Sequence, residues 1–304
     1  AGWGEGTIPP YYPVREEDLQ TYWNRAALRT DPFPERFTDI AAWIDPDGPA
    51  PARAALDIAL HDYVSRKLGL PLHAALGLPE PGRKASSFTI SVDTPENMAA
   101  EARRLRKLPI IKLKLAGDEE DIPRLQAVRA ARPDARLFAD ANAGWSLSQA
   151  LEYLPYLEKA ELEMLEQPLG VAEIEGLGEV QANTSIAIVA DESLHKPEDL
   201  RYLAEAGVRG VNIKLMKVGG VGPALELMEE ARKAGMKIML GCMIETSIGL
   251  SAAAHLAGLA DWLDLDASLL VANDPFEGMT FGEDAVIGLP EGPGIGAHLR
   301  KPQS

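Results

Sequence analysis

The sequence predicts an α/β fold in which a (β/α) barrel of the TIM type follows a smaller N-terminal unit. Eight short apolar runs lie between residues 87 and 268, and a helical pattern separates each run from the next. Apolar strands that alternate with helices form a parallel sheet covered on both faces. Eight such units over about 200 residues fit a closed barrel. An open, doubly wound sheet is the alternative.

Length and composition agree with a fold of this size. The chain has 304 residues, 46% of them hydrophobic, which is enough for one large core or two ordinary ones. A net charge of -16 argues against nucleic acid and anionic membrane surfaces as partners. Cys242 is the only cysteine, which excludes an internal disulfide and suits the cytoplasm. The most apolar segment, residues 248–260, is too short to cross a bilayer.

The first 84 residues are expected to form the N-terminal unit. They open on AGWGEG, which reads as the end of a strand whose earlier part is not in the sequence, and continue through the proline-rich stretch TIPPYYP. Spaced apolar residues then predict three helices, at 16–28, 35–44 and 51–68. A loop rich in Pro and Gly, residues 77–84, marks the boundary with the barrel.

The eight apolar runs that follow are the predicted strands of the barrel. They cover residues 87–92, 110–115, 135–142, 162–168, 186–193, 210–216, 237–243 and 262–268. Each run ends in polar residues. Since all strands of a parallel barrel end at the same mouth, these polar residues should gather there, where barrel enzymes keep their active sites.

Charged residues interrupt the apolar runs at regular intervals. Lys114, Asp140, Glu166, Asp191 and Lys214 are separated by 26, 26, 25 and 23 residues, one barrel unit each time. Each residue therefore occupies a similar height on consecutive strands. One charge at a strand end is typical of a solvated surface, whereas a row of charges in register indicates a functional site.

The three carboxylates in this row predict a metal site. Asp140, Glu166 and Asp191 would repel one another in a buried position unless a cation lay among them. Hard divalent cations prefer such oxygen ligands, and Mg²⁺ keeps positions open for water or substrate. No His or Cys accompanies the three acids, which argues against zinc.

The two lysines of the row predict acid–base chemistry on either side of the metal. A partly desolvated lysine near a cation should have a lowered pKa, so Lys114 and Lys214 are candidate general bases. Lys112 adds a second positive charge beside Lys114. A metal that binds a substrate carboxylate stabilises the enediolate formed when the α-proton leaves. Two lysines can exchange that proton on opposite faces, which predicts a racemase or an epimerase.

Several motifs together resemble the muconate-lactonising subgroup of the enolase superfamily. They are KLK at 112–114, DANAGW at 140–145, EQP at 166–168, ADES at 190–193 and NIKLMKVGG at 212–220. The resemblance covers nearly the whole chain. It implies that Asp140, Glu166 and Asp191 hold one Mg²⁺ per active site. It also implies that Lys114 and Lys214 are the paired acid and base.

The same resemblance implies the remaining roles and the domain organisation. Lys112 would be a neighbour that tunes Lys114 and helps to bind the substrate, and Asn142 would support the first metal ligand. Residues 1–84 would be part of an α+β capping domain, 85–285 the catalytic barrel, and 286–304 a segment that returns to the cap. Homo-oligomers are common among such barrels, so a homo-oligomer is expected.

The sequence DLD on the last predicted strand separates the activities of the subgroup. Asp264 and Asp266 lie on the same face of a strand by its period of two and would form an anionic socket for an ammonium group. Dipeptide epimerases of the L-Ala-D/L-Glu type are similar in this respect, with the socket holding the α-amino group of the dipeptide. An N-acylamino acid racemase, an o-succinylbenzoate synthase or a cycloisomerase is the alternative. A further alternative, from another class, is a binding or structural protein that keeps the barrel without catalysis.

Two polar residues near these motifs are expected to have ordinary positions. Lys217 follows the predicted strand and lies out of register with the row of charges, so we expect it at the surface. Glu245 is expected to cap the helix that starts near Thr246.

Overall fold

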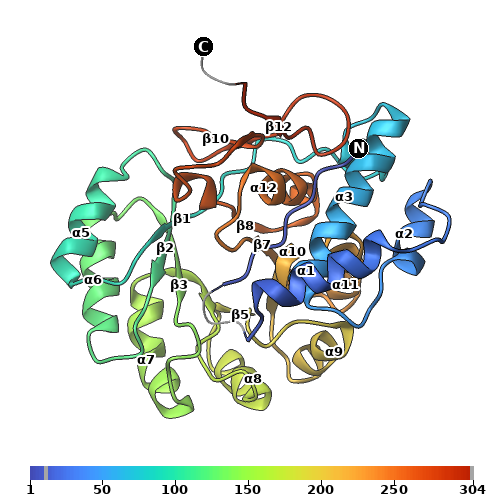
Figure 1. Ribbon diagram of the computed structural model, residues 1–304. Helices are drawn as coiled ribbons and strands as arrows, with labels where there is room; N and C mark the ends of the chain where they lie inside the picture. The colour runs from blue at the N-terminus through green and yellow to red at the C-terminus, as the bar shows by residue number, and fades with distance from the viewer. Residues whose placement is uncertain (10–12, 302–304) are drawn as a thin grey trace.

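A computed structural model describes residues 1–9 and 13–301 and contains an eight-stranded parallel sheet that nearly closes into a barrel (Figure 1). The strands follow one another around the sheet in sequence order. They are β1 (Phe88–Ile90), β2 (Ile110–Lys114), β3 (Arg136–Asp140), β4 (Leu162–Glu166), β5 (Ala187–Ala190), β6 (Gly210–Lys214), β7 (Lys237–Gly241) and β8 (Trp262–Asp264). The predicted barrel is therefore confirmed.

The first and last strands meet through a few hydrogen bonds in place of a regular strand pairing. The Ser87 amide donates to the carbonyl of Leu263 at 2.8 Å, and the Thr89 amide donates to Asp266 Oδ2 at 2.7 Å. These bonds place the end of β8 and the residue Asp266 that follows it against Ser87 and β1.

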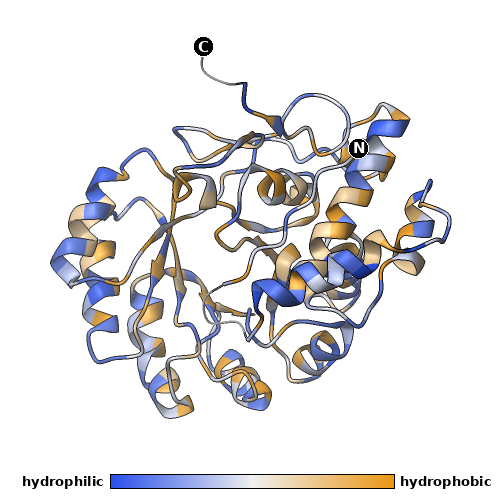
Figure 2. Ribbon diagram, in the orientation of Figure 1, coloured by the Kyte–Doolittle hydropathy of each residue, from blue (hydrophilic) through white to orange (hydrophobic). Residues whose placement is uncertain are grey.

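Helices surround the sheet and connect its strands. They are α5 (Pro95–Arg104), α6 (Asp121–Ala131), α7 (Leu147–Lys159), α8 (Ile174–Ala182), α9 (Pro197–Glu205), α10 (Leu215–Val218), α11 (Val221–Lys233) and α12 (Ser247–Ala254). Figure 2 shows hydrophobic and hydrophilic residues interleaved along these helices, as the amphipathic pattern requires. Local sequence sets several helix starts. In α7, for example, Ser146 and Gln149 form a reciprocal capping box.

The N-terminal helices pack on one side of the barrel. They are α1 (Glu16–Ala27), α2 (Phe37–Trp43), α3 (Ala50–Leu68) and α4 (Leu72–Ala75). From α3, Asp57 accepts hydrogen bonds from the amides of Val221 and Gly222 at the start of α11. The end of the chain also returns to α3, where Asp62 accepts from the Ile295 amide at 2.8 Å. Short strands precede this return: β9 (Phe276–Glu277), β10 (Thr280–Phe281), β11 (Ile287–Gly288) and β12 (His298–Leu299).

The side chains inside the barrel form two layers, which we call the apolar layer and the charged layer. The apolar layer contains Ile110, Phe138, Met164, Val189, Met239 and Trp262, all buried. Two residues further along the same strands come the members of the charged layer, Lys112, Asp140, Glu166, Asp191 and Asp264. The strand period of two therefore points both layers inward, with the charged layer nearer the mouth.

All eight strands end one to four residues before the predicted runs, and in two of them the early end changes the expected position of a site residue. β6 ends at Lys214, and the next four residues form the short helix α10 in place of the expected strand to Met216. β8 ends at Asp264, and Asp266 starts a 3₁₀ turn, η2 (Ala267–Leu269). The expectation that Asp264 and Asp266 share a strand face is thus wrong, because the backbone leaves the strand conformation between them. No helix in residues 1–9 and 13–301 is both long and apolar enough to span a membrane.

Candidate active site

A cavity of about 290 Å³ opens at the mouth of the barrel, above the charged layer. Charged side chains form one part of its wall, namely Lys112, Lys114, Lys214, Asp264 and Asp266. Apolar residues form much of the rest, including Ile8 and Pro9 from the N-terminal segment and Met243, Ile244 and Leu270 from the loops of the barrel. The cavity thus combines a polar base with an apolar wall, as expected for a small-molecule site.

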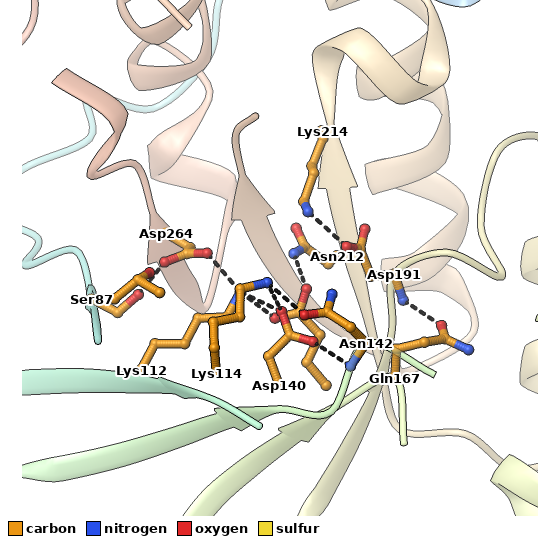
Figure 3. A network of polar contacts seen from close by, with 12 residues as sticks. Ser87, Lys112, Lys114, Asp140, Asn142, Gln167, Asp191, Asn212, Lys214 and Asp264 are labelled. Atoms are coloured by element: carbon orange, nitrogen blue, oxygen red, sulfur yellow. Dashed lines mark hydrogen bonds and ion pairs between the residues drawn. The ribbon is translucent and has the colours of Figure 1, made fainter. Parts of the chain in front are cut away.

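Lys112 is at the centre of the charged layer. Its ammonium lies 3.1 Å from Asp140, 2.6 Å from Glu166 and 2.8 Å from Asp264, and the residue is only 1% exposed (Figure 3). Burial lowers the pKa of Lys112, but the three carboxylates outweigh it and raise the pKa well above its ordinary value. Lys112 is therefore a fixed positive charge that joins the metal-ligand candidates to Asp264.

Asp140 is held between two ammonium groups. Besides Lys112, Lys114 donates to its Oδ2 at 2.7 Å. Burial raises the pKa of Asp140, yet the two lysines prevail and lower the pKa to about 2. Asn142, which has a left-handed backbone (φ 43°), donates its amide to Asp140 Oδ1 at 3.0 Å and accepts from Lys114 at 3.0 Å. The predicted support of Asp140 by Asn142 therefore comes from the backbone of Asn142.

Lys214 and Lys217 both contact the carboxylate of Asp191. Lys214 donates to Oδ2 at 2.6 Å, and Lys217 donates to Oδ1. Burial raises the pKa of Asp191, but these two ammonium groups outweigh it and hold the pKa well below its usual range. Lys217 is only 2% exposed. The expectation of a surface position for Lys217 is thus wrong.

The pKa of Lys214 moves in the direction opposite to the one expected from the sequence. Burial lowers this pKa, but the charges of Asp191 and Glu166 outweigh burial and raise it well above the ordinary value. For Lys217 the balance differs, because burial and the neighbouring Lys214 prevail over Asp191 and lower the pKa. The lowered pKa expected for Lys214 from the sequence assumed a bound metal ion, whose positive charge would offset the carboxylates that raise this pKa.

Glu166 has the least compensated negative charge in the layer. Its Oε1 accepts from Asn212 Nδ2 at 2.7 Å, whereas the buried Oε2 has no hydrogen-bond partner. Lys112 Nζ is close to that Oε2, yet the contact lacks hydrogen-bond geometry. Burial, followed by the charges of Asp140 and Asp191, raises the pKa of Glu166 to about 7.

The residue types at this site suit a hard divalent cation. The carboxylates of Asp140, Glu166 and Asp191, however, contact lysine ammonium groups and do not converge on a single point. Across residues 1–9 and 13–301, no three His, Cys, Asp or Glu side chains are grouped as metal ligands. All the candidate donors are nonetheless carboxylate oxygens, and the unpartnered oxygen of Glu166 can accept a cation. This set of donors suits Mg²⁺.

Asp264 and Asp266 are both buried and both face the cavity. Asp264 accepts from Ser87 Oγ at 2.6 Å, and burial, which raises its pKa, is outweighed mainly by Lys112, so the pKa is lowered. For Asp266, burial and the charge of Asp264 raise the pKa to about 6. The pair can therefore accept an ammonium group at one end of the cavity.

Sequence reasoning missed several buried polar residues that support the charged layer. Gln167 accepts hydrogen bonds from the amides of Asp191 and Ser193, which fixes the turn after β5. The sequence suggested that Glu245 caps α12, but this is wrong, because Thr246 is the N-terminal cap of that helix. Glu245 instead accepts from the Met243 amide at 2.8 Å and is 1% exposed. The best sequence signals were that Gln167 lies within the motif EQP and that Glu245 follows the predicted strand at 237–243.

Comparison with known proteins relates this geometry to a family. Residues 97–303 match the family described as Enolase C-terminal domain-like. The chain is 35% identical over 299 residues to the L-Ala-D/L-Glu epimerase of Bacteroides thetaiotaomicron, a match that covers 97% of this chain and 77% of the relative. It is 39% identical over 233 residues to the L-Ala-D/L-amino acid epimerase of Pedosphaera parvula, covering 75% and 67% of the two chains.

Solved structures of related enzymes have a similar fold. The dipeptide epimerase of Enterococcus faecalis, in complex with Mg and L-Leu-L-Tyr, superposes with a TM-score of 0.89 at 32% identity and covers 97% of this chain and 87% of its own. The N-succinyl Arg/Lys racemase of Bacillus cereus superposes with a TM-score of 0.91 at 27% identity, covering 98% and 84%. The overall fold is thus shared by a dipeptide epimerase and by a racemase of N-acylated amino acids.

Proposed function

The chain belongs to the enolase superfamily and is a dipeptide epimerase, and we propose that it inverts the α-carbon of the C-terminal residue of a dipeptide by proton transfer between Lys114 and Lys214. One observation carries this proposal. The two lysines come from β2 and β6, four strands apart in the barrel, and line the same cavity. A substrate between them presents one face of its α-carbon to each lysine.

The reaction needs one lysine neutral and the other charged. The neutral lysine takes the α-proton, the electrons of the C–H bond enter the substrate carboxylate as an enediolate, and the ammonium of the other lysine donates a proton to the opposite face. Mg²⁺, which Asp140, Glu166 and Asp191 would hold, supplies positive charge that stabilises this enediolate and offsets the carboxylates that raise the pKa of Lys214.

Asp264 and Asp266 favour a dipeptide over an N-succinylated amino acid. Both carboxylates are buried at the cavity, where an ammonium group would be attracted and a succinyl carboxylate repelled. The proposal therefore places the free α-amino group of the dipeptide at this pair. The acylated alternative would leave both acids facing a like charge.

The N-terminal segment supports the cavity from outside the barrel. We propose that residues 1–84 form the cap, 85–285 the catalytic barrel, and 286–304 the segment that returns to the cap. Within these ranges, residues 10–12 and 302–304 lie outside the described residues. Glu5 accepts from the Thr246 and Gly249 amides at the start of α12, which holds the segment with Ile8 and Pro9 over the cavity. A cap in this position keeps water away from the reacting proton. A homo-oligomeric state and a cytoplasmic location stay predictions.

Deuterium exchange tests the proposed reaction. The protein is incubated with Mg²⁺ in D₂O, either with L-Ala-L-Xaa dipeptides or with the matching N-succinyl amino acids, and mass spectrometry follows uptake at the α-carbon. We expect uptake in dipeptides together with formation of the L,D epimer. Exchange confined to the N-succinyl compounds would refute the proposal.

Substitution of Asp266 tests the amino socket. In Asp266→Asn, kcat/KM for a free dipeptide should fall about tenfold more than kcat/KM for the same dipeptide with an acetylated amino group, because only the former is charged. Equal losses for the two substrates would show that Asp266 does not bind the amino group. Asp284→Asn, an exposed carboxylate outside the cavity, is the matched control.

A further inference from the structure

Lys217 is a buried lysine for which the proposed reaction has no role. It lies on α10, directly after β6, and its ammonium contacts three acceptors: the backbone carbonyl of Asp191, Oδ1 of the same residue, and the Asn212 carbonyl at 3.0 Å. Every N–H of the ammonium can thus be satisfied. The side chain ties the end of β5 to the middle of β6.

The turn after α10 explains how Lys217 faces inward. Gly219 and Gly220 have left-handed backbones, with φ of 105° and 124°, and both of their amides donate to the Leu215 carbonyl. A β-carbon on Gly220 would lie 2.4 Å from Asp57 of α3, so this turn accepts no side chain. The short helix is therefore locked in place, with Lys217 directed at Asp191.

Both oxygens of Asp191 are held, each by a different ammonium. Lys217 takes Oδ1, which leaves Oδ2 directed at Lys214 Nζ, 2.6 Å away. A carboxylate with one free oxygen could rotate, whereas this one is fixed from both sides. Asn212, whose carbonyl accepts from Lys217, also holds Glu166 through its side chain.

The other lysine of the proposed reaction has different support. Lys114 contacts Asp140 and Asn142 and none of the groups that Lys217 binds. Asp191 is also a proposed Mg²⁺ ligand, so the comparison is made at saturating Mg²⁺. Under that condition, loss of Lys217 should disturb the Lys214 side of the cavity and leave the Lys114 side largely intact. A residue needed only for folding would affect both sides alike.

We propose that Lys217 is a positioning residue that holds Asp191 toward Lys214 and thereby controls proton transfer on the Lys214 face of the substrate. The proposal rests on the function proposed above. It predicts that removal of the Lys217 ammonium lowers proton transfer on one face far more than on the other.

Exchange measured separately for each epimer tests this prediction. The L,L and L,D forms of one dipeptide are incubated in D₂O with Mg²⁺, and NMR follows loss of the α-proton. Lys114→Ala and Lys214→Ala first identify which epimer each lysine deprotonates. In Lys217→Met, deprotonation of the epimer assigned to Lys214 should fall about 10- to 100-fold, as for loss of other groups that orient a ligand residue. Deprotonation of the other epimer should change little.

A matched variant separates positioning from general loss of a buried ammonium. Lys84 is also partly buried and donates to the carbonyls of Ala257 and Ala260, but it does not line the cavity. Lys84→Met should therefore leave the ratio of the two exchange rates unchanged. An equal loss on both faces in Lys217→Met, or no loss on either, would overturn the proposal. If Lys217→Met does not fold, Lys217→Gln should give a smaller loss with the same asymmetry.

A crystal structure of the Lys217 variant gives a readout that does not depend on turnover. We expect the Asp191 carboxylate to rotate, so that Oδ2 no longer faces Lys214. An unchanged Asp191 would contradict the proposal. If the unaltered protein exchanges neither epimer, the proposed function fails, whereas symmetric exchange in the Lys217 variants of an active enzyme refutes only the role of Lys217.

Discussion

The apolar layer and the charged layer of the barrel are equally buried but have opposite chemistry. Phe138 and Met164 of the apolar layer are 0% exposed, and so are Asp140 and Glu166, two residues further along the same strands. Burial alone therefore does not distinguish the two layers. The two layers differ in what offsets the cost of burial: the apolar layer has no charge to offset, whereas the carboxylates of the charged layer need nearby positive charges.

The apolar layer is stabilised by its own burial, whereas the charged layer depends on opposite charges. Removing a large apolar side chain from water stabilises the fold by about 1.5–3 kcal/mol. A buried charge costs several kcal/mol unless a partner offsets it. Lys112 of the charged layer, together with Lys214 and Lys217 next to it, supplies that offset to the carboxylates. We infer that the apolar layer supplies stability to a site whose own contribution to folding is small.

The largest effect should come from Lys214, which contacts Asp191 of the charged layer. Lys214→Ala should lower the epimerisation rate by about 10²- to 10⁴-fold, the usual contribution of a general acid or base. Asp191 keeps Lys217 as a partner, so the melting temperature should change little. NMR of the product epimer and a thermal melt measure the two effects. Lys233→Ala, an exposed lysine paired with Glu229, should leave the rate unchanged. An active Lys214→Ala enzyme would contradict the two-lysine mechanism.

The next largest effect concerns Mg²⁺. Dialysis against EDTA should abolish epimerisation, and added Mg²⁺ should restore it. Glu166→Gln should weaken Mg²⁺ binding more than about 100-fold by calorimetry, beyond the loss seen for groups that merely support a ligand. Glu163 lies on the same strand but pairs with Arg136 and is not part of the charged layer, so Glu163→Gln is the control. If Glu166→Gln and Glu163→Gln bound Mg²⁺ with equal affinity, Glu166 would not be a Mg²⁺ ligand.

Sequence reasoning could predict the barrel and the row of charges because both follow from periodicity. Asp140, Glu166 and Asp191 recur once per barrel unit, so their common height was visible without a structure. Lys217 could not be placed in this way, because β6 gives way to α10 and the strand period no longer applies. The raised pKa of Lys214 was also hidden, since it depends on contacts with Asp191 and Glu166, which lie more than 20 residues away in the chain.

A substitution in the apolar layer should affect stability and not catalysis. Phe138→Ala should lower the free energy of unfolding by about 3–5 kcal/mol, since it leaves a cavity beneath Asp140. Urea denaturation measures this loss. The rate per folded molecule should change less than about tenfold, far less than for a general acid or base. Leu28→Ala, at a position 82% exposed, should cost less than about 0.5 kcal/mol. If Phe138→Ala lowered the rate as much as Lys214→Ala does, the apolar layer would contribute to catalysis as well as to stability, which would contradict the distinction between the two layers.

Glu245 sharpens the comparison, because it is a buried acid without the ammonium contacts of the charged layer. Burial, and then the charge of Glu5, raises its pKa to about 8. The folded protein therefore binds this proton more tightly than the unfolded chain, whose glutamate pKa is about 4.3. Unfolding releases the proton, so the contribution of Glu245 to stability is present below about pH 4 and is lost as the pH rises toward 8.

Urea denaturation between pH 5 and pH 8 tests this smallest effect. Relative to Glu245→Gln, which mimics the protonated acid, the unaltered protein should lose about 1 kcal/mol of unfolding free energy for each pH unit. Parallel curves would show that Glu245 is ionised in the folded protein. Glu5→Gln should reduce the slope without removing it, because burial is the larger cause of the raised pKa. If the pH dependence of the unfolding free energy disappeared in Glu5→Gln, repulsion by Glu5, and not burial, would be the main cause of the raised pKa of Glu245.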